Sequence, residues 1–252
     1  MRTCGLLTVM SLAVVAACAT ETLDETVSIE GVEYRRFVAD PAQVRVYWSD
    51  PSGKAFRQFV TLVPYLEAKG EQVQMITNGG IFEPQGIPAG LLVQDGRQIR
   101  PLNVGSGKGN FYLKPNGVFF VARGVAGARF SSARLQPEWA VQSGPLLLEN
   151  GKVHPQFRTG SESRLHRNGV GIRSDGKVVF LITRFESNRK PNLYEFAAAF
   201  KEHGCQNALF LDGDLSDMRV SPLDQIKPGN FFGSLIVVMK KQQTPPGNPS
   251  KR

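Results

Sequence analysis

The sequence predicts an α+β fold in which curved antiparallel β-sheets pack around two main helices. Three observations support this class: tight-turn dipeptides recur between alternating apolar residues, two stretches show helical spacing of apolar residues, and two long segments share one order of elements. The chain has 252 residues and a formal charge of +8. Once an N-terminal signal is removed, its length suits a single domain.

Tight turns divide much of the chain into β-hairpins. Asn-Gly and Asp-Gly suit the positive φ angles of short hairpin turns. The turn signals are Asp50-Pro51-Ser52-Gly53, Asp95-Gly96, Asn116-Gly117, Asn150-Gly151 and Asp175-Gly176. Because alternating apolar residues flank these signals, we expect a hairpin at each of them.

Two helices are predicted between the hairpins, over residues 56–69 and 192–203. Each stretch places its large apolar side chains on one face: Phe59, Leu62, Val63 and Leu66 in the first, and Phe196, Ala197 and Phe200 in the second. Asn192 is a suitable N-cap. Gly70 and Gly204 stand where a glycine commonly ends a helix.

Residues 44–82 and 170–216 share the order strand, turn, apolar segment, helix, strand and glycine-rich loop. This order predicts an internal pseudo-twofold duplication. The two loops are Asn78-Gly79-Gly80-Ile81-Phe82 and Asp212-Gly213-Asp214-Leu215-Ser216. Glycine allows a close approach of the backbone to a ligand, so we expect one site at the junction of the repeats. The alternative is a pair of ordinary strand-ending turns.

The N-terminus resembles a bacterial lipoprotein signal. The apolar run 6–17 is too short to cross a bilayer and fits the h-region of a secretory signal. It ends in Val15-Ala16-Ala17-Cys18, which resembles a lipobox with Cys18 as the lipidated residue. The alternative is a plain signal peptide that contains a cysteine.

These features predict a signal peptide over residues 1–17, a tether over 18–33, a folded domain over 34–240 and a disordered basic tail over 241–252. Ala19 stands where an aspartate is linked to retention in the inner membrane. The expected location is therefore the bacterial envelope, at the outer membrane facing the periplasm, with the lipid anchor as the only membrane contact.

Charge and cysteine content limit the partners. Only Cys205 remains in the folded part, so we expect no internal disulfide. The basic residues form no long run and are not interleaved with aromatic residues, which argues against a nucleic-acid partner. The diffuse positive charge favours an anionic sugar-phosphate or an anionic envelope glycan.

Five motifs, NGGIF, PAGLLV, QSGPLLL, RNGVGI and ALFLDGDLS, occur in this order. Together they resemble the phosphodiester glycosidase domain family over about residues 35–240. The family includes bacterial exported proteins and the lysosomal uncovering enzyme, which removes N-acetylglucosamine from a sugar phosphodiester. This chain has DGDLS where the uncovering-enzyme branch has DGGGS, so it resembles an uncharacterised bacterial exported branch.

The resemblance implies cleavage of a glycosyl phosphodiester, whose oxocarbenium-like transition state a nearby carboxylate can stabilise or attack. Asp212 is the candidate for this role, and Glu83 is a second acid or base. His154 is the third catalytic candidate because histidine titrates near neutral pH, although it could equally be a packing residue. His166 is a further histidine, within SRLHRNG.

Substrate-binding roles fall to polar residues of the same motifs. Arg167 suits bidentate contact with phosphate oxygens, or it forms an ordinary surface ion pair. Asn78 and Asn168 are candidates for hydrogen bonds to sugar hydroxyls, although Asn78 could merely cap its own turn. The remaining candidates are Gly79, Gly80, Ser143, Gly213, Asp214 and Ser216. A serine-nucleophile arrangement of Ser143 with His154 and Asp212 is disfavoured, because VQSGP does not match Gly-x-Ser-x-Gly.

No cofactor is predicted. Asp212, Asp214 and Asp217 resemble part of a calcium loop, but they lack its later glutamate and its sixth-position glycine. An improvised divalent cation site stays open. The sequence therefore predicts an exported hydrolase of a sugar-1-phosphodiester or a related envelope glycoconjugate. The alternatives are a non-catalytic binding module for an anionic envelope glycan and an inert structural lipoprotein.

Overall fold

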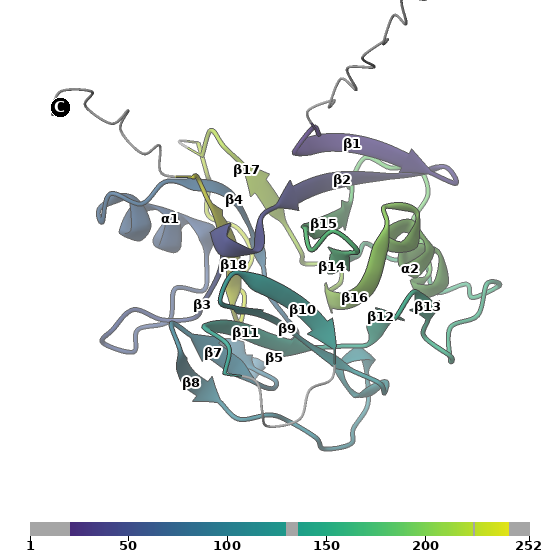
Figure 1. The fold of residues 1–252 in the computed structure, drawn as a ribbon, viewed down its shortest axis with the longest axis horizontal. Helices are drawn as coiled ribbons and strands as arrows, with labels where there is room; N and C mark the ends of the chain where they lie inside the picture. The colour runs from purple at the N-terminus through teal and green to yellow at the C-terminus, as the bar shows by residue number, and fades with distance from the viewer. Residues whose placement is uncertain (1–20, 130–135, 224, 242–252) are drawn as a thin grey trace, which may run out of the picture.

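The computed structural model describes residues 21–129, 136–223 and 225–241. The expected signal peptide, the lipid-bearing Cys18 and the tail after residue 241 lie outside these residues. Two α-helices and mostly antiparallel sheets form the fold, so the predicted α+β class is confirmed (Figure 1).

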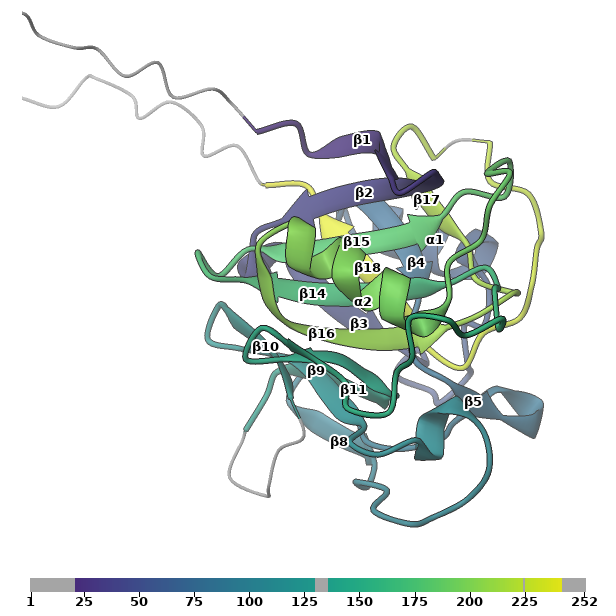
Figure 2. The same cartoon turned by 90° about the vertical axis from the view of Figure 1, so that its right-hand side faces the viewer.

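A seven-stranded sheet forms one layer, and every neighbouring pair in it is antiparallel. Helix α2 (Leu193–Glu202) covers one face of this sheet (Figure 2). In spatial order the strands are β1 (Asp24–Ile29), β2 (Val32–Ala39), β15 (Val178–Thr183), β14 (Asn168–Arg173), β16 (Cys205–Asp212), β12 (Leu146–Glu149) and β13 (Lys152–Val153).

Two smaller sheets complete the core. The four-stranded sheet packs against helix α1 (Phe59–Glu67) and has the order β17 (Met218–Val220), β4 (Val73–Asn78), β18 (Leu235–Met239) and β3 (Val44–Tyr47). The five-stranded sheet has the order β10 (Val125–Arg129), β9 (Gly117–Ala122), β11 (Trp139–Ser143), β7 (Leu92–Gln94) and β8 (Arg97–Arg100).

The main apolar cluster joins all three sheets. Phe180 of the seven-stranded sheet meets Phe119 of the five-stranded sheet edge to face, with ring centroids 6.4 Å apart. Val46 and Ile236 contribute from the four-stranded sheet. Burial of these side chains provides the main driving force that holds the layers together.

The shorter elements are a two-stranded ribbon and three 3₁₀ turns. Strands β5 (Phe82–Glu83) and β6 (Ile87–Pro88) form the ribbon, and the turns are η1 (Pro41–Gln43), η2 (Pro84–Gly86) and η3 (Asn110–Tyr112). No helix in the described ranges is long and apolar enough to cross a membrane.

The predicted helix ends agree closely with the structure. Asn192 forms a capping box with Glu195: its side chain accepts from the Glu195 N–H at 2.9 Å, and the Glu195 carboxylate accepts from the Asn192 N–H. Gly70 and Gly204 follow the two helices with φ of 75° and 77°. The local sequence signals therefore determine where both helices end.

Three of the five predicted hairpin turns join two strands, and the turn at residues 50–53 closes only an isolated antiparallel bridge between Ser49 and Ala55. Asp95-Gly96, Asn150-Gly151 and Asp175-Gly176 join β7–β8, β12–β13 and β14–β15. The hairpin predicted at Asn116-Gly117 is wrong, because the residues before it form the 3₁₀ turn η3 and not a strand. There the Asn116 amide donates to the Phe111 carbonyl at 2.9 Å.

The predicted tether extends too far along the chain. Residues 24–29 form strand β1, which pairs with β2, so the boundary at residue 33 is wrong. Arg35 on β2 holds the first residue of β1 through two hydrogen bonds to the Asp24 carboxylate, both 2.8 Å long. Residues 24–29 therefore belong to the folded domain, although their polar composition resembles that of a linker.

The two predicted repeats share one strand order, the split βαβ arrangement. Helix α1 connects β3 to β4, and the antiparallel strand β18 lies between them. Helix α2 connects β15 to β16, and the antiparallel strand β14 lies between them. This common order supports the duplication hypothesis, which superposition of the two segments would test. It also places the ends of β4 and β16 in equivalent positions.

Candidate functional site

Three of the predicted site residues meet where the two halves join. Asn168 begins β14 and is paired in register with Asp212, the last residue of β16. The Asn168 amide donates to the side-chain oxygens of Asn78 and Thr77, at 3.0 Å each. Asn168 thus connects the end of β4 in one sheet to the end of β16 in the other.

Asn78 holds the loop that follows β16. Both bonds come from its side chain: Nδ2 donates to the Ser216 hydroxyl at 3.1 Å, and Oδ1 accepts from the Asp217 N–H at 3.1 Å. Thr77 adds a bond from its hydroxyl to the Asp217 carbonyl at 2.8 Å. Asn78 and Ser216 are both buried, so the protein itself uses the groups that were predicted to meet a sugar.

Asp212 carries the most perturbed carboxylate of this group. Burial raises its pKa to about 6; the hydrogen bond from the Gly213 N–H opposes this rise, and the negative charge of Asp214 adds to it. The Gly213 N–H donates to Oδ1 at 2.8 Å. Within the described ranges no other hydrogen bond reaches this carboxylate, so Oδ2 is available for chemistry. A perturbed carboxylate of this kind is typical of a catalytic site.

The loop after Asp212 opens to solvent. Asp214 and Leu215 are exposed, whereas Ser216 turns back into the protein. Asp214 acts electrostatically on three neighbours: Asp212, Arg167 and His166. The negative charge of Asp214 thus lies at the centre of the candidate site.

Ser143 is a structural residue and not a nucleophile. Its hydroxyl donates to the Leu211 carbonyl at 2.8 Å and accepts from the Ile81 N–H at 3.2 Å. The side chain is fully buried. Ser143 therefore connects the first glycine-rich loop to the strand that carries Asp212, and it makes no hydrogen bond to His154.

The two glycines after Asn78 are required by close packing. The Gly79 N–H donates to the Ser234 carbonyl at 2.8 Å, so it is not free to line a pocket. A Cβ at Gly80 would lie 2.6 Å from the Gln142 carbonyl oxygen and 2.9 Å from the Ser143 Cβ. Larger residues would separate the loop from β11, which explains the NGG motif in physical terms.

Arg167 does not join the group around Asp212. It is 1% exposed, and its guanidinium donates to the carbonyls of Pro191 at 3.0 Å and Ser163 at 2.7 Å. Burial lowers its pKa to about 10, although the charge of Asp214 opposes this effect. Adjacent strand residues point to opposite faces of a sheet, so Arg167 and Asn168 diverge. The predicted phosphate contact is therefore not supported.

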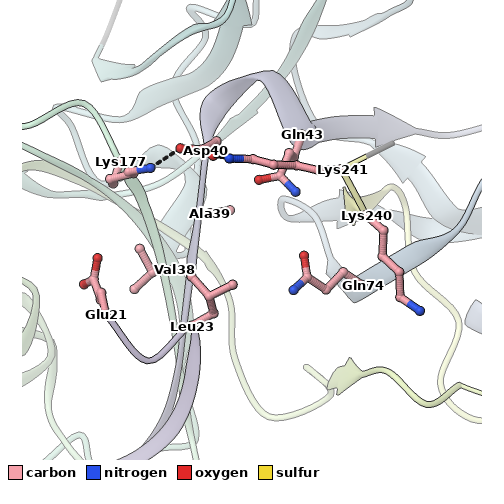
Figure 3. Close-up of a pocket in the computed structure, with 10 residues that line it drawn as sticks. All are labelled: Glu21, Leu23, Val38, Ala39, Asp40, Gln43, Gln74, Lys177, Lys240 and Lys241. Carbon is pink, nitrogen blue, oxygen red and sulfur yellow. Dashed lines mark hydrogen bonds and ion pairs between the residues drawn. The ribbon is translucent and has the colours of Figure 1, made fainter. Parts of the chain in front are cut away.

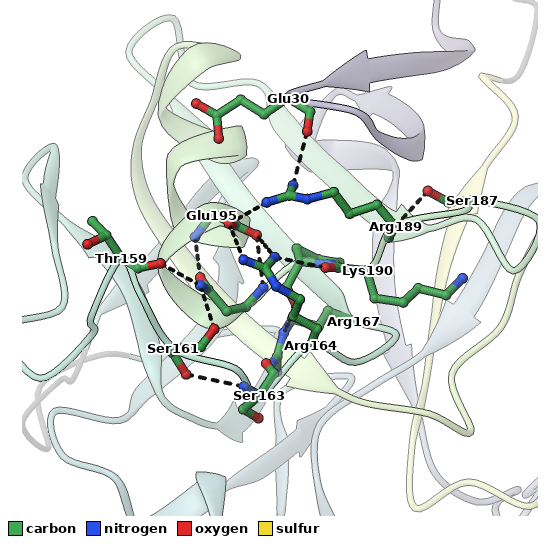
Figure 4. A network of polar contacts seen from close by, with 12 residues as sticks. Glu30, Thr159, Ser161, Ser163, Arg164, Arg167, Ser187, Arg189, Lys190 and Glu195 are labelled. Atoms are coloured by element: carbon green, nitrogen blue, oxygen red, sulfur yellow. Dashed lines mark hydrogen bonds and ion pairs between the residues drawn. The ribbon is translucent and has the colours of Figure 1, made fainter.

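A polar network fixes the segment around Arg167. The Glu195 carboxylate accepts from Arg164 at 2.5 Å and 2.9 Å and from Arg189 at 2.6 Å (Figure 4). Asn192 donates to the carbonyls of Thr159 and Ser161 (Figure 4). The start of α2 thereby anchors the loops before β14 and after β15.

His154 and Glu83 also lie apart from Asp212. His154 is buried and stacks on Phe157 with ring centroids 4.6 Å apart, and its Nδ1 accepts from the Gln156 N–H at 3.2 Å. Burial lowers its pKa. Glu83 is exposed on the β5–β6 ribbon. No contact among the described residues connects either side chain to Asp212, and the stacking of His154 on Phe157 agrees with the alternative that it is a packing residue.

His166 is the histidine that lies beside the loop. Its backbone carbonyl oxygen would be 3.7 Å from a Cβ on Gly213, and its ring stacks on Phe185 with centroids 4.0 Å apart. Burial lowers its pKa to about 4, and the charge of Lys190 adds to this effect. Neither ring nitrogen makes a well-aligned hydrogen bond to a described residue, but the Ser216 backbone lies close enough to the ring to oppose the decrease in its pKa. The sequence feature that could have pointed to His166 as a site residue is its position two residues before Asn168.

One cavity lies away from these residues. It has a volume of about 360 Å³ and is lined by residues near both ends of the described chain, among them Leu23, Val38 and Lys240 (Figure 3). Asp40 at its edge pairs with Lys177 and Lys241. None of the predicted site residues lines it. In residues 21–129, 136–223 and 225–241 no group of three or more His, Cys, Asp or Glu is placed to hold a metal ion.

Fold and site together define an α+β domain with a half-buried carboxylate where the seven-stranded and four-stranded sheets meet. The family model for phosphodiester glycosidase matches residues 71–236, and the chain belongs to this family. An uncharacterised protein of Escherichia coli K12, YigE, is 36% identical over 218 residues, which cover 84% of this chain and 82% of that protein.

Solved structures share the fold at low sequence identity. The catalytic domain of zebrafish N-acetylglucosamine-1-phosphodiester α-N-acetylglucosaminidase, auto-inhibited by its pro-peptide, has a TM-score of 0.62 and 18% identity. The similarity covers 88% of this chain and 85% of that one. A hypothetical protein from Synechocystis has a TM-score of 0.55 and 13% identity, over 86% of this chain and 61% of its own.

Proposed function

We propose that this protein is an exported hydrolase that cleaves a sugar-1-phosphodiester or a related envelope glycoconjugate. Membership of the phosphodiester glycosidase family supports the reaction class. The observation that carries the proposal is Asp212, a half-buried carboxylate with a raised pKa and one unbonded oxygen, where the seven-stranded and four-stranded sheets meet. The partner is an anionic sugar-phosphate, and no cofactor enters the proposal.

The proposed reaction breaks the bond between the anomeric carbon and the phosphate oxygen. The electron pair of that bond leaves with the phosphomonoester, and the sugar develops oxocarbenium character. The Asp212 carboxylate stabilises or attacks the anomeric carbon. Water then supplies the hydroxyl group of the free sugar. Its proton passes to a base, and the phosphate is a sufficiently good leaving group to depart as the anion.

His166 replaces His154 as the proposed base. Its pKa of about 4 keeps the ring neutral at physiological pH, so an unprotonated ring nitrogen can accept a proton, and the same low pKa makes the ring a weaker base than an ordinary histidine. It lies beside Gly213 and next to the charges of Asp214 and Asp217. Asn168 positions Asp212 through the strand pairing and holds the two halves together.

Hydrolysis of a small panel of diesters tests the function. The methyl phosphodiesters of glucose, N-acetylglucosamine, mannose and galactose 1-phosphates are incubated with the purified protein, and free sugar is measured. Release of one sugar together with methyl phosphate supports the proposal. Saturable binding without release would instead support the binding module, and neither binding nor release would contradict both readings.

The rate should depend on pH through Asp212. The carboxylate acts in its charged form, and its pKa is raised to about 6, so kcat/KM should increase as the pH rises from 5 to 7 and then level off. An ordinary aspartate, with a pKa near 4, would give a flat profile over this range. A pH profile measured at low substrate concentration distinguishes these two results.

We also propose that the protein is anchored in the bacterial envelope through a lipid on Cys18, at the outer membrane facing the periplasm. The support is the sequence alone: the apolar run 6–17 followed by Val15-Ala16-Ala17-Cys18. Palmitate labelling of the native chain and of Cys18→Ser tests the anchor. Labelling that persists in Cys18→Ser would contradict it.

A further inference from the structure

Exposed apolar side chains gather around the candidate site. Among the described residues, six large apolar side chains are exposed: Leu23, Val104, Leu165, Phe185, Leu215 and Phe231. The last four belong to the Asp212 loop or to segments that contact it, and we name them the apolar rim. Phe185 and Phe231 are 59% and 62% exposed. Solvent contact of this extent is unfavourable for such rings unless a ligand covers them.

Contacts connect the members of the apolar rim to Asp212. Phe185 lies flat on His166, with an interplanar angle of 7°, and the His166 carbonyl faces Gly213. Leu165 precedes His166 in the chain. On the other side of the loop, the Asn230 amide donates to the Leu215 carbonyl at 2.8 Å, and Phe231 follows directly.

The segment that carries Phe185 is fixed and positively charged. The Lys190 ammonium donates to the carbonyls of Arg184 at 2.7 Å and Phe185 at 2.9 Å. Arg189 anchors the same segment to Glu195 and to the Glu30 carbonyl (Figure 4). Phe185 is therefore exposed on a braced loop, next to a cation that complements a phosphate.

We infer that the apolar rim binds an apolar alcohol esterified to the phosphate, so that the substrate is an amphiphilic glycosyl phosphodiester. This inference rests on the proposed function. The carboxylates of Asp212 and of the exposed Asp214 suit the hydroxyl groups of a sugar, Lys190 suits the phosphate, and the apolar rim suits an alkyl chain beyond it. Two of the four side chains are leucines, which offer no aromatic face to a sugar ring. Hydrolysis yields the free sugar and the phosphomonoester of the apolar alcohol.

A matched pair of substrates tests the inference. Methyl and octyl phosphodiesters of the sugar cleaved in the panel are compared below the micelle concentration of the octyl compound. We expect kcat/KM to be about 30-fold or more higher for the octyl diester, because each fully buried methylene contributes a factor of about 4. Equal values for the two diesters would overturn the inference and leave the proposed function intact.

Two variants and one control locate the effect. Phe185→Ser and Phe231→Ser should each reduce the octyl preference several-fold. Phe231→Ser should leave kcat/KM for the methyl diester within about 2-fold. Phe185→Ser also uncovers the His166 ring, so for this variant only the ratio of the octyl to the methyl value is compared. Val104→Ser removes an equally exposed apolar side chain outside the rim, 61% exposed, and should keep the full preference. An equal loss for both diesters in Phe231→Ser, whose ring does not stack on His166, would mean that the ring holds the sugar. That result would overturn the inference.

A binding measurement covers the case in which no diester is cleaved. Octyl phosphate and methyl phosphate are titrated into the protein by calorimetry. Tighter binding of octyl phosphate, lost in Phe231→Ser and kept in Val104→Ser, would support the apolar rim even if the proposed hydrolysis fails. Binding of both esters with equal affinity, or of neither, would overturn the inference.

Discussion

Asp212→Asn should lower kcat for diester hydrolysis by about 10³-fold or more, the usual cost of losing a nucleophile or a charge that stabilises the transition state. The amide has the same shape and keeps an oxygen that can accept the 2.8 Å bond from the Gly213 N–H. It lacks the negative charge that an oxocarbenium-like centre requires. The loss is therefore chemical and should leave KM nearly unchanged.

Stability measured on the same variant separates this effect from misfolding. Burial raises the pKa of Asp212 to about 6, so its charged form is unfavourable in the folded state at neutral pH. The native state binds the proton more tightly than the unfolded chain does, so this carboxylate lowers stability as the pH rises through 4 to 6. Asp212→Asn should be more stable than the native protein at pH 7 by about 1 to 2 kcal/mol, and equally stable below pH 4.

Asp95→Asn is the matched control for this variant. Asp95 is exposed in the β7–β8 turn with φ of 52°, a conformation that asparagine also tolerates. Both its activity and its stability should stay close to those of the native protein. An Asp212→Asn protein that is fully active would contradict the assigned role of Asp212, whatever its stability.

Arg167→Ala should lower the free energy of unfolding by about 3 to 5 kcal/mol. The substitution removes the only donor to the Ser163 carbonyl among the described residues and leaves the Pro191 carbonyl with just the Leu165 N–H at 3.3 Å. It also opens a cavity beside Phe210, whose ring centroid is 5.8 Å from the guanidinium carbon. Denaturant unfolding followed by circular dichroism measures the change.

The exposed Arg158 provides the comparison, because Arg158→Ala should change stability by less than about 0.5 kcal/mol. The opposite result for Arg167→Ala is informative. If this variant keeps its stability and its KM for the diester rises sharply, Arg167 meets the phosphate as the sequence predicts, and the structural interpretation of its burial is wrong.

Local signals in the sequence were sufficient to predict much of the fold. Asn192 with Glu195, and the glycines at 70 and 204, determine helix ends through contacts within a few residues, so they can be identified without the tertiary structure. The polar loops after two apolar strands led to the expectation that Asn78 and Asp212 share one site, and in the structure Asn168 connects the ends of their strands. Strand β1 was missed because DETVSI is mostly polar, and its pairing with β2 depends on partners along the whole strand.

The roles of individual side chains could not be predicted from the sequence, because they depend on tertiary packing. Arg167 and Asn168 are adjacent in the chain, yet a strand directs them to opposite faces, and only the position of α2 shows that Arg167 is the one that is covered. A bulge between Asn168 and Gly169 sets the pairing of Asn168 with Asp212. The choice between His154 and His166 as the candidate base also depends on tertiary packing, and no sequence motif indicates it.

The most direct test of the central claim is to identify the bond that breaks. The diester that is cleaved most readily is hydrolysed in water enriched in ¹⁸O, and both products are analysed by mass spectrometry. Cleavage at the anomeric carbon, which we predict, places the label in the free sugar, and the released phosphomonoester carries none. Label in a phosphate product would mean attack at phosphorus, and the protein would then be a phosphodiesterase and not a glycosidase.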